Sequence, residues 1–431
     1  VLTEVFSDVS VQYEISGQQI EDNVVAPNGS ISVSGTRGGL DYQIQGQVGE
    51  THGVTTYKES SILGDFSQND YIYRKDVDDR SNSSLSGNLG YEINNNSSAR
   101  FSGQFSEGTS RTDLNRKTTN LRMSPVVDSY QREDIRGDIN NWEIGGDYEY
   151  NTARGDRFKI LLISNSFTPE RLRERWNLTG PESESKNLFL DSASTTRERI
   201  VRSSYTLDLF QGSQDIELGA ERAQTILDSS LALGVLNPSG TASAVVGGLV
   251  PVNVPNARST VEEMRYEPFI IHNWVFNSRM SLESSVLYED SQISQSGEIS
   301  KERNYDYVKP KLDFRYDLTP TIQLRGTMEK IVQQLSFNDF VAALDRNDED
   351  RDVQFGNDNL KQEWYWNYEF NAEYRLPNDI GVASARVFYE DWTDRIERID
   401  VSPSKENLQG ASGNVGDGEK YGLELNSSTR M

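Results

Sequence analysis

The densest group of possible metal ligands in the chain is an acidic run near residue 350. It reads Asp345-Arg346-Asn347-Asp348-Glu349-Asp350-Arg351-Asp352. Hard oxygen ligands of this kind suit Ca²⁺, but an EF-hand loop needs Gly at its sixth position and a bidentate Glu at its twelfth. Counted from Asp345, those positions hold Asp350 and Gly356. Because runs of charge are usually solvated, the sequence predicts an acidic loop and no metal site.

Side chains for catalysis are scarce. The chain has no Cys, which excludes thiol nucleophiles, disulfides and Cys-based zinc sites, and only two His residues, His52 and His272. His272 lies within the apolar stretch 269–274, which is typical of a strand residue facing a lumen or a membrane interface. We therefore expect no catalytic, cofactor-binding or metal-binding residues, no cofactor and no enzyme activity.

Composition removes further classes of protein. The 431 residues include 43 Lys and Arg against 67 Asp and Glu, a formal net charge of −24. This argues against a nucleic-acid partner, because phosphates require a basic face. Mean hydropathy is −0.66, and no stretch approaches the roughly 18 consecutive apolar residues of a spanning helix.

Strict alternation of apolar and polar residues recurs along the whole chain. A period of two places successive side chains on opposite faces of an extended strand. Each such segment therefore predicts a strand with one apolar and one polar face. The clearest examples lie within residues 85–93, 142–150, 311–318, 322–329 and 364–375.

The predicted connections alternate between short and long. Tight turns rich in Gly, Pro, Asn, Asp and Ser are predicted at 37–39, 94–96, 152–155, 211–213, 277–278, 319–320 and 377–379. Long polar connections are expected around 51–80, 107–137, 168–197, 227–260, 334–361 and 394–418, with a shorter one at 290–303. In an antiparallel meander, this order places the short turns on one rim and the long loops on the other.

That asymmetry favours an all-β fold, an antiparallel up-and-down transmembrane β-barrel. We expect about 16 strands of roughly 9–12 residues, close to the ~9–11 that cross a bilayer. Aromatic residues near predicted strand ends, such as Trp142, Trp274 and Trp392, suit membrane-interface girdles, although aromatic residues also favour strands in general. A soluble antiparallel sandwich is the alternative architecture.

Three stretches in the C-terminal part carry a family resemblance. They are Gly356-Asn357-Asp358-Asn359-Leu360-Lys361-Gln362-Glu363 followed by Asn367-Tyr368-Glu369, then 386–396, and finally Asn414-Val415-Gly416 followed by 421–425. In order and spacing, they resemble the barrel domain of TonB-dependent outer-membrane receptors, with Gln362 where Pro is common. Two further stretches, 307–310 and 335–340, look like a pattern of one receptor subgroup. Locally, Asn357 and Asn359 suit a turn into a strand, and Gly422 suits a site beneath an aromatic ring.

The resemblance implies that residues 1–431 are part of one outer-membrane barrel domain, with about 16 of the roughly 22 strands of the family barrel. The plug domain and the C-terminal strands of the family are not recognisable, so we expect a partial chain of a larger receptor. The implied function is energised uptake of a scarce solute such as a siderophore, a vitamin or an oligosaccharide. The implied partners are the TonB complex of the inner membrane, acting through a plug domain, and the lipid and lipopolysaccharide of the bacterial outer membrane.

No substrate-binding residue can be named from the sequence, and two functions remain as alternatives. These are a passive outer-membrane porin and a soluble sheet-rich binding module. The excess of Asp and Glu suggests a negative lumen, suited to a cationic or neutral polar solute. A basic patch at Arg171–Trp176 is most simply an exposed loop of mixed charge. The uncharged stretch Ser229–Ala257 could fold over a ligand, but packing on its neighbours is the simpler explanation.

Overall fold

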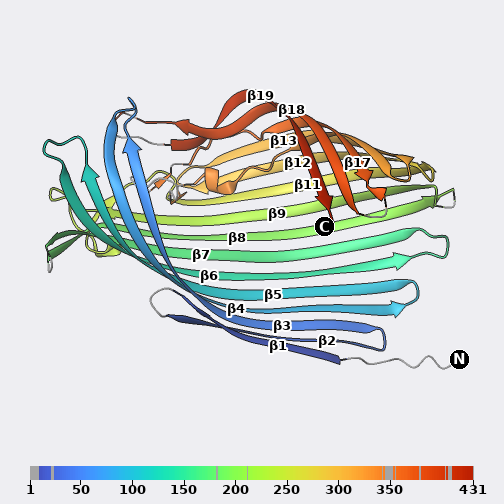
Figure 1. The fold of residues 1–431 in the computed structure, drawn as a ribbon, viewed down its shortest axis with the longest axis horizontal. Helices are drawn as coiled ribbons and strands as arrows, with labels where there is room; N and C mark the ends of the chain where they lie inside the picture. Colours follow the sequence, from blue (N-terminus) through green and yellow to red (C-terminus); the bar gives the residue numbers. More distant parts are fainter. Residues whose placement is uncertain are drawn as a thin grey trace.

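The computed structural model describes residues 9–20, 24–180, 183–210, 212–341, 343–344, 353–354, 356–377, 380–402, 404–405 and 410–430. The fold is an antiparallel sheet of 17 strands that curls into a barrel-like wall, together with a two-stranded ribbon of β15 and β16 (Figure 1). Within these ranges, no helix has both the length and the apolar character needed to cross a bilayer.

The strands are β1 (Val9–Gln19), β2 (Val25–Arg37), β3 (Leu40–Ile62), β4 (Gln68–Asn94), β5 (Ser97–Asn120), β6 (Val127–Asn151), β7 (Arg157–Gly180), β8 (Ser183–Leu209), β9 (Gln214–Val235), β10 (Val250–Val252), β11 (Arg258–Asn277), β12 (Met280–Gly297), β13 (Lys301–Thr319), β14 (Ile322–Val332), β15 (Ala343–Leu344), β16 (Val353–Gln354), β17 (Trp364–Arg375), β18 (Gly381–Asp400) and β19 (Gly410–Thr429). The short 3₁₀ turns η2 (Ala244–Val246) and η3 (Phe337–Asp339) lie in two of the connections.

The order of pairing is that of a meander. From β1 to β9 each strand pairs with the next along the chain. The sheet continues from β9 to β11, then through β12, β13, β14, β17 and β18 to β19. The short β10 pairs beside β9. The predicted up-and-down antiparallel fold is confirmed, and the expectation of about 16 strands is close to the 17 in this sheet.

Tight turns form where the sequence predicted them. The turn between β2 and β3 places Gly38 and Gly39 at φ of 58° and 81°, a region that favours glycine. The turn after β6 closes by a hydrogen bond from the Thr152 amide to the Asp156 carbonyl, 2.8 Å long. These turns lie together at one rim of the wall, on the right in Figure 1. Residues 211 and 378–379, within two other predicted turns, lie outside the described residues.

The prediction of long loops at 51–80, 107–137 and 168–197 is wrong. Most of these residues belong to strands, and β4 alone has 27 residues, paired on both sides over nearly its whole length. Beyond the membrane the outward face of a strand no longer meets lipid, so apolar and polar residues no longer need to alternate. The backbone still gains from pairing its N–H and C=O groups. The strands therefore continue as long hairpins beyond the segment that the alternation marks.

Register partners show which side chains share a face. Leu89, Phe101, Gly146 and Leu162 lie directly opposite one another on four successive strands and form one outward-facing apolar row. Further rows of this kind lie on either side of it. On β6 the outward apolar side chains run from Tyr150 to Trp142, a length that matches the ~9–11 residues of a bilayer crossing.

Candidate functional site

The face opposite the apolar rows is polar and lines the concave side of the wall. Arg100 on β5 donates to Asp147 on β6 at 2.9 Å, and Arg325 on β14 pairs with Asp313 on β13 at 2.6 Å. A polar inner face is what a water-filled lumen requires. This face is therefore the part of the described chain that can line a water-filled space.

The connection between β14 and β17 folds inward onto this face. Leu335, Phe340 and Leu360 pack with apolar side chains of β9, β11 and β12 in one buried cluster, and Phe340 is fully buried. The wall residues of this cluster are Leu227, Val261 and Ile293. Because these side chains face the lumen, covering them removes apolar surface from water.

Hydrogen bonds fix the inward-folded connection to the wall. The Gln295 side chain donates to the Phe340 carbonyl, and the Tyr305 hydroxyl donates to the Leu360 carbonyl, both at 3.2 Å. Lys301 Nζ donates to the carbonyl of Asp358 at 2.7 Å. These contacts satisfy main-chain oxygens that would otherwise be buried without a partner.

A group of carboxylates is buried on the inner face near this connection. Glu289 is fully buried and pairs with Lys309 at 2.8 Å, and Lys309 also pairs with Glu267. Burial raises the pKa of Glu263 to about 7, against the opposing effect of Arg265. Glu263 lies beyond Tyr266, the last outward-facing aromatic residue of β11, and so lies outside the membrane-spanning part. It can change charge near neutral pH.

A basic group lies on the inner face of the long hairpins. Arg173 makes a two-pronged pair with Glu133 at 2.6 and 3.1 Å, and Arg116 and Arg175 approach the same carboxylate at 3.5 and 3.8 Å. Burial alone would raise the pKa of Glu133, but the three guanidiniums hold it below its usual value. The inner face therefore has separate basic and acidic areas, so the negative interior that the composition suggests is inverted locally by this basic group.

The two histidines do not meet. His52 on β3 lies 2.7 Å from an Asp79 oxygen, and His272 on β11 lies 3.2 Å from the Gln214 side-chain oxygen. Both belong to the outward-facing rows of their strands. Among the described residues, no group of three or more His, Asp or Glu side chains could hold a metal ion. The acidic run Asp345–Asp352 lies outside the described residues, so the prediction of a solvated loop there stays a prediction.

The two other stretches singled out in the sequence have structural roles. Arg171–Trp176 lies within β7 and not in a loop, and its Arg173 is the main partner of Glu133. Much of Ser229–Ala257 packs on the β8–β9 hairpin, where Leu231 and Val254 join Leu188 and Leu190 in a buried cluster. The expectation that this uncharged stretch packs on its neighbours is confirmed. These two groupings depend on contacts between strands, which no local sequence signal reveals.

Two of the local predictions are confirmed in detail. A Cβ atom on Gly422 would lie 2.7 Å from the ring of Phe388, its register partner on β18, so the ring lies over the glycine. The Asn357 side chain accepts from the Asn359 amide at 2.9 Å, which turns the chain before β17. Asn357 also donates to the Ser412 carbonyl at 2.9 Å, which ties this turn to β19.

Comparison with solved structures shows the same fold in outer-membrane receptors. The chain resembles the copper transporter OprC (10% identity, TM-score 0.63), covering 99% of this chain and 59% of that one. It also resembles the Serratia marcescens hemophore receptor HasR, solved as a double mutant with its hemophore HasA and heme. The identity is 11% and the TM-score 0.60, and the match covers 99% of this chain and 62% of that one. A third similar structure is that of the ferric enterobactin receptor PfeA of Pseudomonas aeruginosa, solved as a mutant. The identity is 15% and the TM-score 0.56, and the match covers 97% of this chain and 59% of that one. The chain thus spans about three-fifths of the length of these proteins.

Sequence comparison identifies the family. No curated protein sequence matches the chain. Residues 22–430 match the family model described as "TonB dependent receptor-like, beta-barrel". This is a family of outer-membrane receptors and transporters, not of enzymes. Together with the two-faced antiparallel wall, the match shows that this chain belongs to the TonB-dependent receptors, in their β-barrel domain.

Proposed function

We propose that this chain forms part of the wall of one barrel domain in an outer-membrane receptor that imports a solute through its lumen. The observation that carries the proposal is the division of the sheet into an outward apolar face and an inward polar face. The inward-folded connection between β14 and β17 supports it, because it lies on the inner face, along which a solute would pass. Import would be energised by the TonB complex of the inner membrane, acting through a plug domain.

The candidate solutes are those named for the similar solved structures and those of the wider family. Copper, heme and ferric enterobactin are named for the structural neighbours, and vitamins and oligosaccharides are further candidates. The inner face offers both guanidiniums and carboxylates, so its charge favours no single class. Outer-membrane lipid and lipopolysaccharide would surround the apolar face.

Uptake in cells with and without TonB tests the proposal. The receptor gene containing this chain would be expressed in a Gram-negative host that lacks its own receptors for the probes. Accumulation of copper, heme and ferric enterobactin would be followed, with cobalamin and a maltooligosaccharide as further probes. Saturable accumulation of one probe that requires TonB is the expected result.

Two outcomes would contradict the proposal. Equal, unsaturable accumulation of small probes with and without TonB would identify a passive porin. Recovery of the protein in the aqueous phase, without detergent, would identify a soluble binding module. Fractionation of the same cells gives the second readout.

A further inference from the structure

One buried carboxyl group of the inner face lies beneath the β14–β17 connection. Glu263 on β11 is only 6% exposed, and its register partner on β12 is Ile293. Val261 lies two residues before it, on the same face of β11. Ile293 and Val261 both belong to the buried cluster that the connection covers through Phe340. Because the wall is a single sheet, the burial of Glu263 depends on this covering segment.

Side chains of the connection also bond to this group. When the amide of Gln334 is oriented so that both of its ends have partners, its nitrogen donates to Glu263 Oε1 at 3.2 Å. Its oxygen then accepts from Arg265 Nη1 at 3.0 Å. A second amide of the connection, that of Gln362, donates to Glu289 Oε1 at 3.4 Å. The segments before and after Phe340 are thus both tied to the same carboxylates.

The cations around Glu263 are shared with other carboxylates. Arg265 pairs with Glu267 at 3.1 Å and with Glu221 at 3.3 Å. Lys309 pairs with Glu267 and, at 2.8 Å, with Glu289. The titratable and charged side chains that surround Glu263 on this face are Arg202 on β8, Glu221 on β9, Arg265 and Glu267 on β11, Glu289 on β12, and Arg303, Tyr305, Tyr307 and Lys309 on β13. Arg202 lies 3.7 Å from Glu221, and Arg303 lies over the Phe340 ring. The charge of Glu263 is therefore poorly compensated, and burial favours its protonated form.

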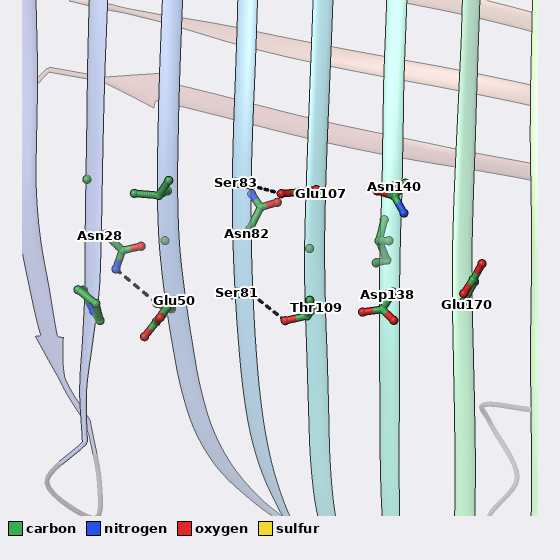
Figure 2. Close-up of a pocket in the computed structure, with 16 residues that line it drawn as sticks. Asn28, Glu50, Ser81, Asn82, Ser83, Glu107, Thr109, Asp138, Asn140 and Glu170 are labelled. Atoms are coloured by element: carbon green, nitrogen blue, oxygen red, sulfur yellow. Dashed lines mark hydrogen bonds between the residues drawn. The ribbon is translucent and has the colours of Figure 1, made fainter.

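Carboxylates on the outward face are placed differently. A hollow of about 760 Å³ across β2 to β7 is lined by four of them on separate strands, Glu50, Glu107, Asp138 and Glu170 (Figure 2). All four are exposed, so water solvates them whatever their neighbours do. A change in their charge is not coupled to a covering segment, and one of them can serve as a control for Glu263.

We propose that protonation of Glu263 controls the attachment of the β14–β17 connection to the wall. In mild acid the carboxyl group is neutral and stays covered at little cost. Once ionised, it gains solvation only where water reaches it, which requires the connection to leave. The pKa of about 7 in the covered state lies above the 4.5 of a solvated glutamate, so a rise in pH through this range favours release. Release uncovers the apolar side chains of Leu227, Val261 and Ile293 to the lumen.

Hydrogen exchange of the full chain in detergent, followed by mass spectrometry from pH 5 to pH 8, tests this proposal. Protection factors, which correct for the intrinsic effect of pH on exchange, should fall by about tenfold in residues 333–341 and 356–363. This is the change expected when attachment raises the proton affinity of Glu263 by about that factor. The paired parts of β11 and β12 should stay protected throughout. In Glu263→Gln, which stays neutral, the connection should remain protected at every pH.

Glu107→Gln, which neutralises an exposed carboxylate of the outward hollow, is the matched control and should follow the wild-type profile. Gln334→Ala keeps the test decisive if Glu263→Gln folds poorly, because Gln334 is exposed and lies outside the apolar cluster. Its removal lets water approach Glu263, so the fall in protection should begin at lower pH. Equal protection of the wild-type connection at pH 5 and pH 8 would overturn the proposal. So would a wild-type profile in Glu263→Gln, or a fall in Gln334→Ala at the wild-type pH.

Discussion

At the scale of single residues, the inner face shows two treatments of buried charge. Glu133 is compensated by three guanidiniums, whereas Glu263 has a carboxyl group whose pKa is raised by burial. A buried carboxylate that keeps its charge needs its partners, and one that takes up a proton does not. The two sites therefore respond differently to the same neutralising substitution.

Neutralising Glu133 should destabilise the long hairpins. In Glu133→Gln, the side chains of Arg116, Arg173 and Arg175 lose their shared carboxylate in a buried setting, and breaking such a pair costs about 3–5 kcal/mol. Urea unfolding in detergent, followed by tryptophan fluorescence, measures the change. Glu184→Gln, which removes the exposed partner of Arg132, is the control and should leave the unfolding midpoint in place.

Neutralising Glu263 should instead remove a dependence on pH. Because its folded-state pKa of about 7 exceeds the unfolded value of 4.5, its contribution to stability is full below pH 4.5 and is lost as the pH rises through about 7. The loss amounts to at most about 3 kcal/mol. Unfolding free energies of the wild type and Glu263→Gln should therefore diverge in favour of the variant between about pH 5 and pH 8.

The control for this measurement is Glu262→Gln, on the outward face of the same strand. Its unfolding free energy should follow the wild-type pH profile. Parallel curves for the wild type and Glu263→Gln would show that Glu263 does not titrate in this range.

At the scale of elements, the buried apolar cluster around Phe340 should hold the β14–β17 connection against the inner face of the wall. Phe340→Ala empties a fully buried site, and such changes cost about 3–5 kcal/mol. Hydrogen exchange should therefore accelerate in residues 333–341 and 356–363 while the paired strands stay protected. Phe66→Ala, at an exposed tip between β3 and β4, is the control. Unchanged exchange near Phe340 would mean that the cluster does not hold the connection.

The pairing of β18 and β19 should depend on the missing side chain at Gly422. A Cβ atom there would approach the Phe388 ring to 2.7 Å, so Gly422→Val must displace the ring or the strand, at a cost of about 1–3 kcal/mol. Hydrogen exchange along β19 measures the effect. Gly418→Val lies on the same strand with nothing within 4 Å and should be tolerated. Equal exchange in the two variants would contradict the argument.

At this scale, the sequence predicted the strand segments on which the membrane imposes an apolar and a polar face. Alternation marked the segments whose two faces meet different solvents, and Gly, Pro and Asn marked the turns. The extensions of β4 and β7 were missed because their outward faces do not meet lipid, so no apolar–polar alternation marks them. The Arg173–Glu133 pair was missed because the two residues are 40 positions apart in the chain and meet only when β6 and β7 pair in this register. The inward-folded connection was missed for the same reason, since its apolar partners lie on other strands.

At the scale of the whole molecule, stability in a bilayer should depend on which face carries a charge. Phe101→Lys places an ammonium in the middle of the apolar band, which costs about 2–4 kcal/mol at the bilayer midplane. Ser102→Lys, the next residue along β5, faces the lumen and should be tolerated. The fraction of folded protein in outer-membrane preparations, read from heat-modifiable gel mobility, compares the two. Similar losses in both variants would contradict the assignment of faces.

The serial pairing of the strands has a consequence for biogenesis. Each of the nine strands from β1 to β9 finds its partner in the segment made just before or just after it. An insertion machine could therefore release this polypeptide into lipid one hairpin at a time, without waiting for distant segments.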